Sequence, residues 1–241
     1  MSAYGAISSR STSSLPSTTW KLASKRSGAP KHLTLHHVTL ETARALPGLV
    51  DYLHRTFADE LAGGRTYPQE ILPGEVYTRE QFDAYYFAAD VLVAVLGQPT
   101  SESAADAPDG SIVSIGFAEA VSGRAWEECL AGCYYVKPNY PGRSSHICNA
   151  GFLVPPSQRG HGIGTVLARS YLHYGPRLGY EASVFNLVYV NNVASVKLWE
   201  ALDFEKAGRI PRAGRLRTAD GDGEEYVDAW VFYRRFDPPG L

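Results

Sequence analysis

Cysteine is scarce in this chain, and its three residues, Cys129, Cys133 and Cys148, cannot all pair with one another. They lack the spacing of a zinc cluster, and the seven histidines show no metal-binding spacing either. We therefore expect buried, reduced thiols in an intracellular protein, with a catalytic thiol as the alternative. No apolar run reaches the length of a membrane span, and the longest, at Val91–Leu96, has the length of a strand.

A strong net charge is also absent. The formal net charge is −2, so no overall field draws the chain to nucleic acid or to an anionic membrane, and we expect neither as a partner. The composition, 44% hydrophobic and 20% charged, is that of an ordinary globular protein. The length allows one or two domains. We expect a single domain over residues 32–241.

Acidic residues are missing from the start of the chain, where none precedes Glu41. Residues 1–31 are rich in serine and threonine and contain several basic residues, so we expect them to be disordered. A basic, hydroxylated, acid-free segment also fits a mitochondrial transit peptide, with an untargeted tail as the alternative. The expected compartment is therefore cytoplasmic or mitochondrial.

Hydrophobic periodicity predicts strands and helices in alternation. The expected strands cover residues 32–40, 91–96, 111–121, 132–137, 147–154, 183–190 and 226–236. The expected helices begin at Thr42, at the capping-box residue Thr78, after the glycine turn at 160–164, and at Asn191 or Asn192. We expect strands 91–96 and 111–121 to form a hairpin. The order predicts an α/β fold of the α+β type, a mixed sheet flanked by helices.

The most informative segment is a glycine-rich turn between a strand and a helix. Strand 147–154 ends at two prolines, and Gly160, Gly162 and Gly164 precede an amphipathic helix. The unpaired N–H groups of such a helix start point one way and suit a phosphate or pyrophosphate. A dinucleotide-binding turn would need glycine where Thr165 stands, and the ending of a P-loop is missing. A glycine-rich connection without a ligand is the structural alternative.

Two motifs resemble the signatures of the GNAT superfamily of acetyl-CoA-dependent acetyltransferases. Arg159-x-x-Gly162-x-Gly164 is similar to the turn that holds the coenzyme A pyrophosphate, and Asn192-x-x-Ser195-x-x-x-Trp199 is similar to the second signature. The resemblance implies a central, mostly antiparallel sheet with a splayed parallel pair. It also implies acetyl-CoA as co-substrate without a metal, held by Phe152, Leu153, Val154, Arg159, Gly160, His161, Gly162, Ile163, Gly164, Thr165, Asn192 and Ser195.

The sequence departs from the superfamily's common catalytic pattern in two places. Trp199 stands where many relatives have a tyrosine that protonates the thiolate, and an indole N–H is a far poorer acid. The strand before the glycine turn offers Asn149 where many relatives have a glutamate base. Proton transfer must then rely on water or on a residue from elsewhere, for which Glu119 and His146 are the candidates.

Asparagines instead follow the expected cleft, at Asn149, Asn186 and Asn192. An amide offers two donors and an acceptor without a charge, which suits a substrate carboxylate and amine; for Asn192 a helix N-cap is the alternative. The segments 146–152, 183–189 and 208–216 resemble the fungal proline-analogue acetyltransferases, which N-acetylate azetidine-2-carboxylate and related imino acids. This resemblance covers roughly residues 130–216. It implies that the three asparagines take part in substrate binding or catalysis.

The sequence thus predicts an acetyl-CoA-dependent N-acetyltransferase for a small amino or imino acid, such as a toxic proline analogue that it would detoxify. A protein or peptide N-acetyltransferase is one alternative. A non-catalytic acyl-CoA-binding sensor is another, because the usual tyrosine and glutamate are missing. The resemblance also implies a homodimer as a frequent state.

Overall fold

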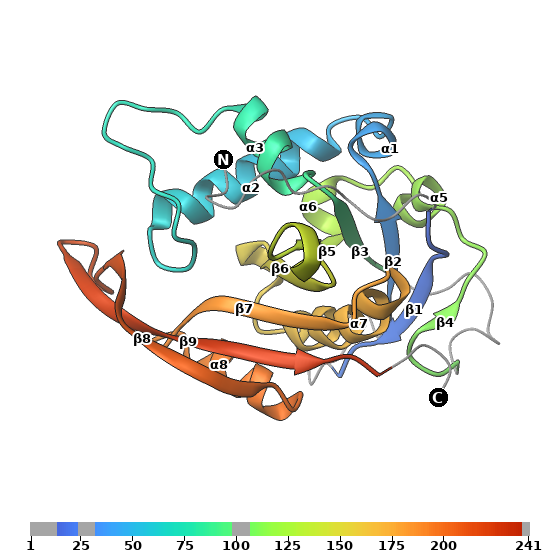
Figure 1. Ribbon diagram of the computed structural model, residues 1–241. Coiled ribbons are helices and arrows are strands. Elements are labelled where there is room, and N and C mark those ends of the chain that lie inside the picture. Colours follow the sequence, from blue (N-terminus) through green and yellow to red (C-terminus); the bar gives the residue numbers. More distant parts are fainter. Residues whose placement is uncertain (1–13, 24–31, 98–106, 238–241) are drawn as a thin grey trace.

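The computed structural model describes residues 14–23, 32–97 and 107–237 (Figure 1). Its framework is a nine-stranded sheet in the order β4-β1-β2-β3-β5-β6-β7-β9-β8. Neighbouring strands are antiparallel except β6 and β7, which are parallel. The strands are β1 (Thr18–Lys21), β2 (His32–Val38), β3 (Asp90–Leu96), β4 (Ser111–Ile112), β5 (Leu130–Pro138), β6 (Ile147–Leu153), β7 (Ala182–Tyr189), β8 (Glu205–Arg217) and β9 (Glu224–Arg235). The predicted mixed, mostly antiparallel sheet is confirmed.

Helices pack on both faces of the sheet and give two cores. They are α1 (Leu40–Arg44), α2 (Leu49–Gly63), α3 (Arg79–Tyr86), α5 (Phe117–Val121), α6 (Trp126–Cys129), α7 (Ile163–Arg177) and α8 (Val193–Ala201), with short 3₁₀ turns η1 (Gly142–Ser144) and η2 (Pro156–Gln158). One core joins the sheet to α7 and α8 through Tyr134, Tyr171 and Trp199. The other joins it to α2 and α3 through Phe57 and Phe82. No helix among the described residues is long and apolar enough to cross a membrane.

The predicted helix from Thr42 to Phe57 is two helices. Thr39 caps α1 in a capping box with Thr42, and the chain then turns at Pro47 and Gly48 before α2 begins. Gly48 has a φ of 76°, a left-handed conformation that glycine adopts without strain. Thr78 and Gln81 form the predicted capping box of α3, and this prediction is confirmed.

The prediction that residues 1–31 are disordered is wrong for residues 14–23, the part that the structure describes. Thr18–Lys21 form β1, which pairs with β2 on one side and with β4 on the other. Trp20 is buried at 4% exposure, and its indole N–H donates to Thr18 Oγ1 at 2.8 Å. Residues 1–13 and 24–31 lie outside the described residues, so the transit-peptide prediction is not tested there.

The hairpin predicted between residues 91–96 and 111–121 is also wrong. Strand β3 pairs with β2 and β5, whereas β4 is a two-residue strand beside β1, and residues 117–121 form α5. Phe117, Ala120 and Val121 pack into one apolar cluster, which is the i, i+3, i+4 spacing of a helix face. Strand β8 was not predicted, because its burial pattern is almost entirely exposed and gives no apolar alternation.

Candidate active site

The site lies where β6 and β7 separate. Only two pairs of the parallel ladder form, Ile147 with Ala182 and Cys148 with Ser183, and the strands diverge beyond them. Residues 149–153 of β6 still pair with β5 on their other side. One edge of β6 therefore faces an opening, where an extended amide-containing ligand can pair with the backbone.

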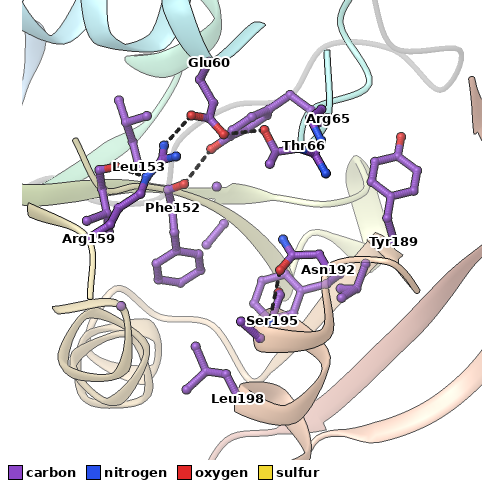
Figure 2. A pocket seen from close by; sticks show the side chains of 18 of the residues that line it. Glu60, Arg65, Thr66, Phe152, Leu153, Arg159, Tyr189, Asn192, Ser195 and Leu198 are labelled. Atoms are coloured by element: carbon purple, nitrogen blue, oxygen red, sulfur yellow. Dashed lines mark hydrogen bonds and ion pairs between the residues drawn. The ribbon is translucent and has the colours of Figure 1, made fainter. Parts of the chain in front are cut away.

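The opening between the two strands belongs to a cleft of about 1000 Å³, part of whose lining is drawn in Figure 2. Its walls come from the end of α2 and the following loop, from β6, from the glycine turn with α7, and from β7 with α8. The lining includes these residues from the predicted site: Asn149, Phe152, Leu153, Val154, Arg159, Gly160, Gly162, Ile163, Gly164, Thr165, Asn186, Asn192 and Ser195. Residues from the end of α2 and from the chain between β6 and α8 are thus brought together around one space.

The glycine turn presents backbone donors to this cleft. Gly162 is the N-cap of α7 with a φ of 79°, and Gly160 has a φ of 80°, so both need the left-handed conformation. Among the residues that the structure describes, the N–H groups of Gly162, Ile163 and Gly164 have no acceptor. A Cβ at Gly164 would meet nothing within 4 Å, so the space beside the turn is open. These features fit a pyrophosphate.

The Arg159 guanidinium is already engaged at the mouth of the cleft. Its Nη2 lies 2.5 Å from Glu60 Oε2, and its Nε donates to the Val154 carbonyl at 3.0 Å (Figure 2). Thr66 Oγ1 donates to the other oxygen of Glu60 at 2.7 Å. Arg159 thus ties the turn to α2 and the loop after it. The backbone of residues 162–164, rather than this side chain, is left to meet an anion.

A cluster of three partly buried asparagine amides lies at the splay of β6 and β7. Asn139 Oδ1 accepts hydrogen bonds from Asn149 Nδ2 at 3.0 Å and from Asn186 Nδ2 at 2.6 Å. Asn139 Nδ2 donates to Asn186 Oδ1 at 3.1 Å. Asn139 is not a lining residue of the cleft, whereas Asn149 and Asn186 are. It therefore holds the two lining amides in a fixed relation across the splayed strands.

Asn186 owes its position to a bulge in β7. Phe185 pairs with Phe232 and Val188 with Trp230, so β7 carries one residue more than β9 over this stretch. Bulges re-aim side chains and are frequent beside active sites. The irregularity turns the mid-strand asparagine toward Asn139 instead of leaving its amide without a partner.

Asn192 and Trp199 have structural partners. Asn192 Oδ1 accepts from the Ser195 N–H at 3.2 Å, so the predicted N-cap of α8 is confirmed, and Asn192 also lines the cleft. The Trp199 indole donates to Ser195 Oγ at 3.1 Å and packs on Phe185 with a centroid distance of 4.3 Å. Trp199 is therefore a wall of the cleft that contacts the aromatic core.

Three predicted residues lie elsewhere. His161 belongs to the glycine turn but is not a lining residue of the cleft. Glu119 is exposed on α5, and His146 contacts the Arg143 carbonyl through Nδ1 at 3.1 Å; neither lines the cleft. Glu119 and His146, the two candidates for proton transfer, therefore lie on segments outside the lining of the cleft.

Sequence reasoning missed the contributions of α2, the loop after it, and α3. Asp59 and Glu60 are the carboxylates of the lining, and Tyr67 Oη donates to the Phe152 carbonyl at 2.9 Å. Tyr85 and Tyr135 also line the cleft, and their hydroxyl oxygens are 2.8 Å apart. Asn139 was not among the predicted site residues. No spacing in the sequence links these residues to the glycine turn.

The cysteines form no part of this chemistry. All three are buried and free, as predicted. Burial raises the pKa of the Cys133 and Cys148 thiols to about 12, so neither is a thiolate at neutral pH. The described residues contain no group of three His, Cys, Asp or Glu side chains that could hold a metal ion.

Comparisons of the sequence and of the fold with known proteins agree on one family. The profile of the acetyltransferase (GNAT) family matches residues 80–204, which include the glycine turn and α8. The chain is 42% identical over 177 residues to N-acetyltransferase aca1 of Schizosaccharomyces pombe, covering 73% of this chain and 75% of that protein. A GCN5-related N-acetyltransferase from Kribbella flavida superposes with a TM-score of 0.59 at 24% identity, covering 85% of this chain and 98% of its own.

The Salmonella typhimurium protein yncA, solved with its cofactor acetyl-CoA, superposes with a TM-score of 0.56 at 13% identity, covering 87% of this chain and 96% of its own. These likenesses to solved structures concern the fold. The family profile and the relative in S. pombe concern the sequence itself, over more than half of the chain. The chain belongs to the GNAT family of acetyltransferases and is an N-acetyltransferase enzyme.

Proposed function

We propose that this enzyme transfers the acetyl group of acetyl-CoA to the amine of a small amino or imino acid, with a proline analogue as one acceptor. The observation that carries the proposal is the neutral amide cluster of Asn139, Asn149 and Asn186, two of which line the same cleft as the helix start with free N–H groups. Uncharged amides suit a zwitterionic acceptor, because they bind a carboxylate and an amine equally well.

Each part of the cleft has a role in this reaction. The free N–H groups of residues 162–164 would take the pyrophosphate, and the open edge of β6 would pair with the pantetheine amides. Acetyl-CoA supplies the activated thioester carbonyl. The acceptor ammonium first gives one proton to water, and Asn149 and Asn186 then orient the neutral amine so that its nitrogen lone pair attacks that carbonyl carbon. The C–N bond forms, the C–S bond breaks, and the amine proton leaves to water as the thiolate departs.

Proton transfer in this scheme needs no strong acid or base from the protein. Coenzyme A thiolate is a good leaving group, and the half-buried cleft reaches solvent, so water can carry the proton. Glu60, the α2 carboxylate that contacts the residue before the glycine turn, is occupied by Arg159 and Thr66. Expulsion of the thiolate is therefore possible without the tyrosine that Trp199 replaces.

Tyrosine side chains connect elements that line the cleft. Tyr67 Oη donates to the Phe152 carbonyl of β6, and the hydroxyl groups of Tyr85 and Tyr135 are hydrogen-bonded to each other. These contacts between lining residues favour a small acceptor over the alternative, a protein or peptide N-acetyltransferase. The other alternative, a non-catalytic acyl-CoA sensor, would bind the coenzyme in the same way but would not use the amide cluster.

Two measurements on the full chain test the proposal. Isothermal titration calorimetry should show acetyl-CoA binding, and a thiol-release assay should show turnover with small amino and imino acids, including azetidine-2-carboxylate and L-proline. Binding without release of thiol for any acid would identify the sensor. Turnover confined to peptides would identify the protein acetyltransferase.

A further inference from the structure

Lys137 is a half-buried cation beside the amide cluster that the proposed mechanism has not used. Its Nζ lies 3.9 Å from the ring centroid of Tyr85 and 4.3 Å from that of Tyr135. Its hydrogen-bond acceptor is the Tyr85 carbonyl, at 3.4 Å. Two aromatic faces hold an ammonium in place by cation–π attraction, but they do not neutralise its charge.

Lys137 is not itself a lining residue of the cleft, but it lies against three residues that are. In the antiparallel pairing of β5 with β6, Lys137 is directly opposite Asn149. Directly opposed residues leave the same face of a sheet with their Cβ atoms about 5 Å apart. Both tyrosines and Asn149 line the cleft. A Cβ on Gly151 would overlap the ring of Tyr135, so glycine at that position allows the ring, and with it the Lys137 ammonium, to lie over β6.

No carboxylate of the described residues pairs with Lys137. In this respect Lys137 differs from Lys206, which also lies over an aromatic ring. Lys206 Nζ lies 4.5 Å from the Trp230 ring centroid and also forms an ion pair with Glu200. Burial lowers the pKa of Lys137 to about 8, so at neutral pH the ammonium is still the main form. A half-buried charge without a counter-ion is costly unless a ligand supplies one.

We propose that the Lys137 ammonium binds the carboxylate of the acceptor amino or imino acid and so makes the enzyme specific for free acids. This inference rests on the proposed function and names the feature of the substrate that the site selects. In an α-amino or α-imino acid, one carbon joins the carboxylate to the amine. A carboxylate at Lys137 therefore leaves the amine within reach of Asn149 and Asn186, the amides that orient it toward the thioester.

The test compares an acid with its carboxamide, which keeps the shape and loses the charge. With wild-type enzyme at saturating acetyl-CoA, kcat/KM for the best acid of the panel should exceed that for its carboxamide by about 10–100-fold, the range of a charge-assisted hydrogen bond. Lys137→Met should raise the KM of the acid by a similar factor, with a smaller change in kcat, and should leave the carboxamide unaffected. Lys137→Arg should retain most of the preference.

Lys206→Met is the matched control, because it removes a lysine from an aromatic ring outside the cleft; it should behave as wild type. Equal kcat/KM for acid and carboxamide in the wild-type enzyme would overturn the inference while the proposed function stands. So would an unchanged acid preference in Lys137→Met. If no amino or imino acid is acetylated although acetyl-CoA binds, the proposed function fails, and the inference fails with it. The wild-type comparison decides the question even if Lys137→Met does not fold.

Discussion

Asn139 gives the sharpest test of the amide cluster, because it touches two lining residues without lining the cleft itself. Asn139→Ala removes three hydrogen bonds, two accepted by Oδ1 and one donated by Nδ2. Each contributes about 0.5–1.5 kcal/mol net. Water can replace part of that loss in a half-buried cleft, so we expect about 2 kcal/mol of lost transition-state stabilisation. At about 1.4 kcal/mol per tenfold, this is roughly a 30-fold fall in kcat/KM for the acceptor.

The assay is thiol release under saturating acetyl-CoA, with the acceptor concentration varied. The Kd of acetyl-CoA, measured by calorimetry, should stay as in the wild type, because the glycine turn is unchanged. Adding Asn139→Ala to the double variant Asn149→Ala with Asn186→Ala should cost little more, since its partners are already gone. An unchanged kcat/KM for Asn139→Ala, or full additivity in the triple variant, would refute the argument that Asn139 acts by positioning these amides.

Three further changes test other parts of the structure. Gly162→Val forces a β-branched residue into a left-handed conformation at the coenzyme turn and should abolish acetyl-CoA binding in calorimetry. The control is Gly179→Val, at a φ of 87° beyond the other end of α7, which should lower Tm but keep the affinity for acetyl-CoA. Equal affinity losses in the two variants would reject the pyrophosphate assignment. Trp20→Ala should destabilise the protein by about 3 kcal/mol in urea unfolding; a change near zero would mean that β1 adds nothing to the fold. Trp199→Phe should retain most of kcat, since the indole serves as a wall; a loss of ~100-fold or more would instead assign it a role in proton transfer.

The sequence was most informative where function depends on local backbone geometry. The glycine turn and the start of α8 are each set by a few adjacent residues, and both lie in the cleft as predicted. Strands β6 and β7 were found because their apolar residues are consecutive. The asparagines in them were noticeable because asparagine is unfavourable within a strand.

The remainder of the site could not be predicted because it depends on pairing between distant segments. Asn139 meets Asn186 only because β5, β6 and β7 are neighbours in the sheet, and Lys137 meets Asn149 only through the register of β5 and β6. Tyr67 reaches Phe152 from a loop 85 positions earlier in the chain. Strand β1 was not predicted because the sequence around it is rich in serine and threonine. Its one large buried side chain, Trp20, packs into the core only because β1 pairs with β2.

The central claim is that this cleft acetylates the amine of a small free acid. Its most direct test is a competition in one reaction, in which the full chain and acetyl-CoA meet equal concentrations of azetidine-2-carboxylate and a short peptide with an N-terminal proline, with both products quantified by mass spectrometry. The account predicts that N-acetylated azetidine-2-carboxylate accumulates in large excess over acetylated peptide. Acetylated peptide as the main product, or neither product although acetyl-CoA is bound, would contradict it.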